Sequence, residues 1–95
     1  MKSLYDEGSL TMFLKDRIKS DNAPRLREEA FDLLKEYKPE KVVCDCEALQ
    51  YISSSGLRVL LEIGKAYKLS VINVSAEVYE ILDLSGFTNM DEFFD

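Results

Sequence analysis

The segment Tyr51-Ile52-Ser53-Ser54-Ser55-Gly56-Leu57 joins two apolar stretches of the chain. Before it, residues 41–46 (KVVCDC) form the continuous run that is typical of a buried central strand. After it, residues 57–63 (LRVLLEI) have the spacing of a helix that is apolar over most of its surface. We therefore expect the three serines to lie at a strand-to-helix turn, where hydroxyl groups commonly cap the helix.

The helix after this turn is predicted over about Ser55 to Tyr67. Its apolar residues form two adjacent stripes, which leave a narrow exposed strip made of Arg58, Glu62 and Lys65. Arg58 and Glu62 are spaced to pair at i, i+4. Ser55 lies on the same strip, one turn before Arg58.

Outside this region the pattern predicts an alternation of strands and helices. Residues 8–14 read as a strand, with residues 3–6 as a short partner joined by a tight turn at Glu7-Gly8. Residues 15–22 read as a polar turn that ends at Asp21 and Asn22, which are expected to cap a helix running to about Tyr37. Residues 46–52 read as a loop, residues 68–74 as a buried strand, and Ala76 to about Leu84 as a third helix. We expect Ser85-Gly86 to end that helix and residues 87–95 to form a last edge strand.

This order predicts one α/β domain over residues 1–95. Its parallel crossovers give a small mixed, mostly parallel sheet of four to five strands with about three helices on it.

Composition excludes several classes of function. The net charge of −6 disfavours direct binding to nucleic acid and to anionic membranes. No apolar run is long enough to insert into a bilayer, and the N-terminus does not resemble a signal peptide. The expected location is therefore the cytoplasm.

Catalytic chemistry also finds little support. The chain contains no histidine, which removes the Ser-His-Asp and Cys-His mechanisms. Cys44 and Cys46 fall on one face of a predicted strand and are too few to hold a metal, so we interpret them as small buried apolar residues. We predict no enzyme activity, no metal and no cofactor.

The serine turn itself has two interpretations. It is either only a helix N-cap, or the site of a regulated charge, because a helix N-terminus accommodates a phosphate group well. Phosphorylation would add nearly two negative charges at one small surface.

The turn resembles a family signature. Residues 52–57 followed by Val59-Leu60-Leu61 resemble the motif of the bacterial anti-sigma-factor antagonists, the STAS domain family. Residues 17–26, 71–78 and 81–87 are also similar to family segments, so the resemblance extends in order over almost the whole chain. Ser53 lies where the family usually has an aspartate.

The resemblance implies a partner-switching protein. Such a protein binds an anti-sigma factor that is also an ATP-using serine kinase, is released when that kinase phosphorylates it, and is reset by a serine phosphatase. Carried over by position, the acceptor is Ser55, with Ser54 and Ser53 as alternatives. The implied partner-binding residues are Asp21, Asn22, Ser53, Ser54, Ser55, Gly56, Arg58, Glu62 and Lys65. Because STAS-like domains also serve as adaptor subunits of transport or signalling complexes without a phosphorylation cycle, that role is the alternative.

Overall fold

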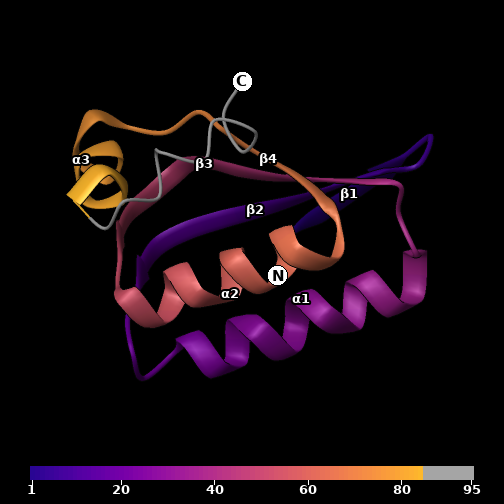
Figure 1. The fold of residues 1–95 in the computed structure, drawn as a ribbon, viewed down its shortest axis with the longest axis horizontal. Coiled ribbons are helices and arrows are strands. Elements are labelled where there is room, and N and C mark those ends of the chain that lie inside the picture. Colours follow the sequence, from indigo (N-terminus) through magenta and orange to yellow (C-terminus); the bar gives the residue numbers. More distant parts are fainter. Residues whose placement is uncertain (85–95) are drawn as a thin grey trace.

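The structure is a computed structural model that describes residues 1–84 of the 95-residue chain. Its elements follow the predicted order of strands and helices (Figure 1). They are β1 (Ser3–Asp6), β2 (Ser9–Ile18), α1 (Ala23–Tyr37), β3 (Lys41–Ile52), α2 (Ser54–Ala66), β4 (Lys68–Ile72) and α3 (Ala76–Leu84).

The four strands form one sheet in the order β1-β2-β3-β4. β1 pairs with β2 antiparallel, and β2, β3 and β4 pair in parallel through crossovers that contain α1 and α2. These two helices lie side by side on one face of the sheet, and α3 packs against β3 (Figure 1). The mixed, mostly parallel sheet with three helices confirms the predicted fold class.

The core is built from the alternating residues of the central strands and the apolar stripes of the helices. From the strands, Leu10, Met12, Val42 and Cys44 are completely buried or nearly so. The helices contribute Ala30, Leu34, Leu57, Leu60, Ile63, Val78 and Leu82 to the same cluster. α2 is buried along one face, to which five of its thirteen residues belong.

Both central strands are longer than predicted. Residues 15–18 continue β2, and residues 46–52 continue β3, so the predicted turn and loop over these residues are wrong. Two irregularities in the β2–β3 register, between Phe13 and Lys15 and between Asp16 and Arg17, explain the error. At each of them β3 advances by one extra residue, so its buried positions change from every second residue to Cys46, Leu49 and Ile52.

The β1–β2 hairpin confirms the predicted two-residue turn. Glu7 and Gly8 both have positive φ, at 47° and 84°, as a type I′ turn requires. Asp6 pairs with Ser9 directly across this turn.

Helix boundaries agree with the predictions within a residue or two. α1 ends at Tyr37 and is capped by Lys38, whose backbone is left-handed, and Ser75 caps α3 by accepting a hydrogen bond of 3.1 Å from Val78 N–H at its Oγ. β4 ends at Ile72, earlier than predicted. The predicted helix end at Ser85-Gly86 and the edge strand over residues 87–95 lie outside the described residues. None of the helices in residues 1–84 is long and apolar enough to cross a membrane.

Candidate functional site

The serine turn lies at the carboxyl ends of the two central strands. Ile18 and Ile52, the last residues of β2 and β3, are paired, and the ladder continues with a hydrogen bond of 2.8 Å from Ser53 N–H to Ile18 O. Because the strands are parallel, the loop after β2 (residues 19–22) and the turn after β3 leave the sheet at the same end, the carboxyl end of the strands. The structure therefore brings the predicted loop and serine residues together.

Ser53 is the N-cap of α2. Its hydroxyl accepts a hydrogen bond from Gly56 N–H at 3.3 Å, and its carbonyl accepts one from Leu57 N–H at 3.0 Å. The helix begins at Ser54, one residue earlier than predicted. Serine and aspartate are about equally good N-caps, so Ser53 fills the capping role that an aspartate at this position would fill.

Gly56 joins the helix to the sheet. A Cβ atom at Gly56 would lie 2.7 Å from Ile18 Cγ2 and 2.7 Å from Ile52 Cγ1, which is closer than carbon atoms can pack. The first turn of α2 is therefore seated directly on the ends of β2 and β3. With any larger residue at Gly56, either the Ile18 and Ile52 side chains or the first turn of α2 would have to shift.

Ser54 and Ser55 differ from Ser53 because their hydroxyls are free. Ser54 is exposed, Ser55 is half-buried, and within residues 1–84 neither side chain makes a hydrogen bond. The first N–H groups of any helix lack partners inside the helix. Since Ser53 accepts from Gly56 and Leu57, the Ser54 and Ser55 N–H groups are the donors left at this helix start.

The Asn22 side chain organises the loop after β2. Its amide oxygen accepts from Lys19 N–H at 2.7 Å, and its amide nitrogen donates to Arg17 O at 2.9 Å. Asn22 occupies the N-cap position of α1 but makes no side-chain capping bond to that helix, so the predicted capping by Asn22 is wrong. Asp21 beside it is exposed.

The strip on α2 includes an ion pair with α1. Glu62 Oε2 lies 2.9 Å from both Arg27 Nε and Arg27 Nη2, with each side chain about half exposed. This contact replaces the predicted Arg58–Glu62 pair, which is absent from the described residues. The hydrogen bond to Glu62, together with the charge of its carboxylate, raises the pKa of the Arg27 guanidinium.

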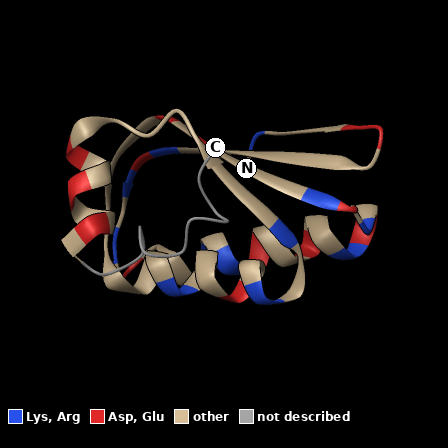
Figure 2. Ribbon diagram, turned by 45° about the horizontal axis from the view of Figure 1, so that its top comes forward, with Lys and Arg blue, Asp and Glu red and all other residues tan. Residues whose placement is uncertain are grey.

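Arg58 and Lys65, the basic residues of the strip, are both exposed. Figure 2 shows basic and acidic residues interspersed along α1 and α2, whereas α3 contains only acidic ones. The Arg27 contribution was missed because nothing in the spacing of α1 and α2 indicates which faces of the two helices meet.

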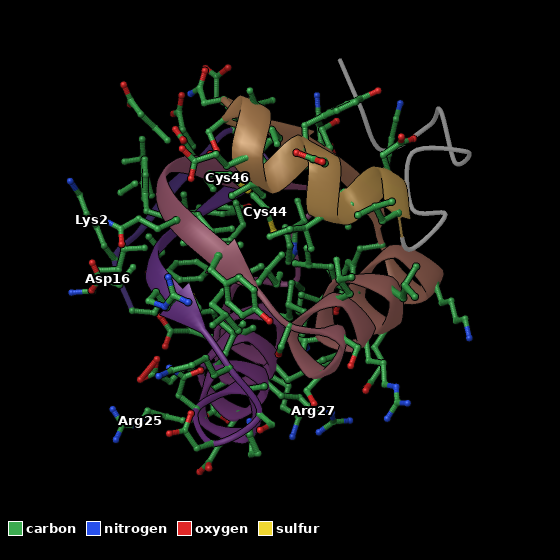
Figure 3. All side chains as sticks on the ribbon, turned by 90° about the vertical axis from the view of Figure 1, so that its left-hand side faces the viewer. Lys2, Asp16, Arg25, Arg27, Cys44 and Cys46 are labelled. Atoms are coloured by element: carbon green, nitrogen blue, oxygen red, sulfur yellow. The ribbon has the colours of Figure 1, made fainter. Side chains whose placement is uncertain are left out.

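A hollow of about 870 Å³ lies beside the Asn22 loop. It runs along the part of β2 beyond β1, and Arg17, Asn22, Arg25 and Glu29 contribute to its wall. Arg25, Asp16 and Lys2 lie along this side of the molecule (Figure 3). Charges of both signs line the hollow, so it presents no single electrostatic preference.

The two cysteines are buried away from this site. Both are free thiols, 1% exposed, and lie between β3 and α3 (Figure 3). Burial raises the pKa of Cys46 to about 12 and raises that of Cys44 as well. Nucleophilic or metal-binding chemistry needs a thiolate, so this environment disfavours both. The interpretation of the pair as small buried apolar residues is confirmed.

Comparisons with known proteins agree with this geometry. The family model of the STAS domain matches residues 5–95. The protein named "Putative anti-sigma factor antagonist BtrV" from Bordetella bronchiseptica is 32% identical over 89 residues, which are 88% of this chain and 76% of that protein.

Two solved structures share the fold. The anti-sigma factor antagonist SpoIIAA in its unphosphorylated form has a TM-score of 0.80 at 14% identity, covering 99% of this chain and 84% of that one. A sulfate transporter family protein from Wolinella succinogenes has a TM-score of 0.75 at 18% identity, covering 96% and 79%. Together with the serine turn at the carboxyl ends of the two central strands, the family-model match over residues 5–95 establishes that the chain belongs to the STAS domain family.

Proposed function

We propose that this chain is an anti-sigma-factor antagonist that works by partner switching. In its unphosphorylated form it binds an anti-sigma factor that is also an ATP-using serine kinase. Phosphorylation of Ser55 by that kinase weakens the complex, and a serine phosphatase restores binding. The observation that best supports the proposal is that the three serines differ in their hydrogen bonds. Ser53 caps the helix, whereas the Ser54 and Ser55 hydroxyls have no hydrogen bond within residues 1–84.

A phosphate on Ser55 is compatible with the fold. The cap of α2 depends on Ser53, so modification of its neighbour leaves the bonds from Gly56 and Leu57 in place. The free N–H groups and the positive end of the helix dipole favour an anion there. The added charge then acts on the partner rather than on the domain, through repulsion and the cost of desolvating the phosphate in an interface.

The proposed binding face combines residues from three segments. It includes Asp21 and Asn22 from the loop after β2, the serine turn through Gly56, and Arg58, Glu62 and Lys65 from α2. The resemblance to BtrV and to SpoIIAA, both described as anti-sigma factor antagonists, supports a partner of the anti-sigma class. Sites other than Ser55 remain as alternatives in this proposal, namely Ser54, which is more exposed, and Ser53.

The acceptor is tested by incubating the protein with a cognate anti-sigma kinase and ATP, then mapping the phosphate by mass spectrometry. We expect one phosphate, present in Ser54→Ala and Ser53→Ala and lost in Ser55→Ala. Undiminished phosphorylation of Ser55→Ala would refute the assignment. Calorimetry then compares Ser55→Asp with Ser55→Asn, which has the same shape without the charge. Weakened kinase binding by the aspartate alone supports the repulsion mechanism, and equal affinity contradicts it.

A second candidate is a constitutive adaptor subunit of a transport or signalling complex. The structural similarity to a sulfate transporter family protein, together with Ser53 in place of the usual aspartate, favours it. This role predicts that affinity purification from the native cytoplasm recovers a transporter subunit and unmodified protein. Recovery of a serine kinase with protein phosphorylated at the serine turn decides for the first candidate.

A further inference from the structure

We propose that β1 is a self-association edge, through which two copies of this chain join their sheets antiparallel about a two-fold axis at Leu4. The inference concerns a surface separate from the serine turn, because β1 pairs with residues 9–12 of β2, whereas the serine turn follows β3 and lies beside Ile18 at the opposite end of β2.

The first observation is which backbone groups of β1 are free. Phe13 N–H donates to Lys2 O at 3.0 Å, so Lys2 directs its backbone groups toward β2. In an antiparallel pair this direction alternates along the strand. Leu4 and Asp6 therefore also bond to β2, whereas the N–H and C=O groups of Ser3 and Tyr5 point outward. Among the described strands, β2 is the only one that pairs with β1.

The second observation is the register that these groups allow. If Leu4 lies opposite Leu4 of the second copy, Ser3 of each chain lies opposite Tyr5 of the other. Both members of these pairs point outward, so each pair exchanges two N–H···O=C bonds. Shifting the axis to Ser3 or to Tyr5 loses one of the two outward pairs. The register with Leu4 on the axis is thus the one that uses all free groups of β1.

Charge favours the same register. Lys2 precedes β1, whereas Asp6 and Glu7 lie at its end and in the turn, so the two ends of the strand have opposite charge (Figure 2). The two-fold places Lys2 of each copy opposite Asp6 of the other. Opposite charges in such directly facing pairs stabilise a sheet, and like charges destabilise it.

The side chains at the centre are apolar and unusually exposed. Leu4 is 60% exposed, and Tyr5, which stacks on Tyr37 at 4.8 Å between ring centroids, is 41% exposed. Pairing brings the two Leu4 side chains into contact on the outer face of the joined sheet, because facing side chains at a position without hydrogen bonds approach closely. A four-residue strand buries little area, so the dimer is weak and forms at high concentration.

The test is sedimentation equilibrium from about 10 µM to about 1 mM, with amide exchange measured by NMR at both ends of that range. We expect Tyr5 N–H to exchange more slowly as the concentration rises, while Leu4 and Asp6, already bonded to β2, do not change. A chain that stays monomeric over the whole range overturns the proposal. Protection of Tyr5 that is independent of concentration also overturns it, since the edge is then covered within one chain.

Two sets of variants identify the interface. Ser3→Pro removes an outward N–H and leaves the β1–β2 ladder intact, so dimerisation should weaken by about tenfold, whereas Ser3→Ala keeps it. An unchanged melting temperature shows that the fold of Ser3→Pro is retained. Lys2→Asp and Asp6→Lys should each weaken the dimer, and their combination should restore it. A dimer that persists in Ser3→Pro, or single charge reversals without effect, would place the contact elsewhere.

Discussion

Gly56 on α2 and Ile18 at the end of β2 lie so close together that a single methyl group would not fit between them: a Cβ on Gly56 would be 2.7 Å from Ile18 Cγ2. This contact fixes the height of the serine turn above the sheet. It also explains why a glycine follows the serines, since Gly56 does not have a positive φ and is needed for space rather than for backbone conformation.

Gly56→Ala should therefore destabilise the protein by about 1–3 kcal/mol, the usual cost of overpacking a closely packed contact. Urea denaturation measures the loss. Ser54→Ala, in the same turn but exposed, is the matched control and should change stability by less than about 0.5 kcal/mol. A Gly56→Ala protein as stable as the control would show that Ile18 and Ile52 can move aside.

The N-cap makes a separate prediction for Ser53. Ser53→Ala should lower the free energy of unfolding by about 1 kcal/mol, because Gly56 N–H loses its acceptor. Ser53→Asp should retain the cap and place a negative charge at the positive end of the helix, so its stability should equal or exceed that of the wild type. If the alanine and aspartate variants unfold at the same urea concentration, the Ser53 hydroxyl is not a significant cap.

The Arg27–Glu62 pair should contribute little to stability despite its good geometry. Both side chains are about half exposed, so solvent screens their attraction. In a double-mutant cycle of Arg27→Ala and Glu62→Ala, we expect a small favourable coupling that disappears in high salt. A large coupling that persists in high salt would mean that the pair is effectively buried. Because Glu62 belongs to the proposed binding face, the same variants should alter partner binding more than stability.

The two buried cysteines should be protected from thiol reagents. With the pKa of Cys46 raised to about 12 and that of Cys44 raised too, almost no thiolate exists near pH 8 in the folded protein. Ellman's reagent should react slowly with the native protein but rapidly with both thiols after the protein has been unfolded in urea. Rapid reaction of the native protein would contradict the burial of this pair.

The same raised pKa values predict a loss of stability in alkali. The folded state keeps its thiol protons above pH 9, where the thiols of the unfolded chain lose theirs, so unfolding releases protons. The free energy of unfolding should thus fall as the pH rises from about 9 toward 12. A Cys46→Ala variant should show a shallower fall, although it is less stable overall. An equally steep fall in this variant would assign the effect to other groups.

Much of the fold could be predicted because the local patterns agree with the tertiary structure. The apolar alternation at Leu10 and Met12, the stripes of α1 and α2, and the Glu7-Gly8 turn each indicate their element without distant information. The residues 46–52 could not be assigned in this way. Their buried positions recur every third residue because β3 bulges twice against β2, and a bulge depends on the partner strand rather than on the strand itself.

In the candidate site, too, the features set by local sequence could be predicted, and those set by packing could not. The serine motif identified the turn and its position before a helix, but the hydrogen bond that distinguishes Ser53 from Ser54 and Ser55 depends on where α2 begins. The predicted capping role of Asn22 was wrong, because an asparagine before a helix can bond either to the helix or to the preceding residues. Here Lys19 N–H is available as a donor and Arg17 O as an acceptor. The contact of Arg27 with Glu62 could not be predicted without knowing how α1 and α2 pack against each other.

The bond from Ser53 N–H to Ile18 O also sets when the serine turn acquires its shape during folding. The β1–β2 hairpin joins neighbours in sequence and can form early, but the parallel pairing of β2 with β3 joins strands separated by all of α1 and closes slowly. The serine turn is positioned only when that closure reaches Ile18 and Ile52. A nascent or partly folded chain therefore lacks this ordered surface, so under the proposed function a partner that binds the serine turn would select chains whose sheet is complete.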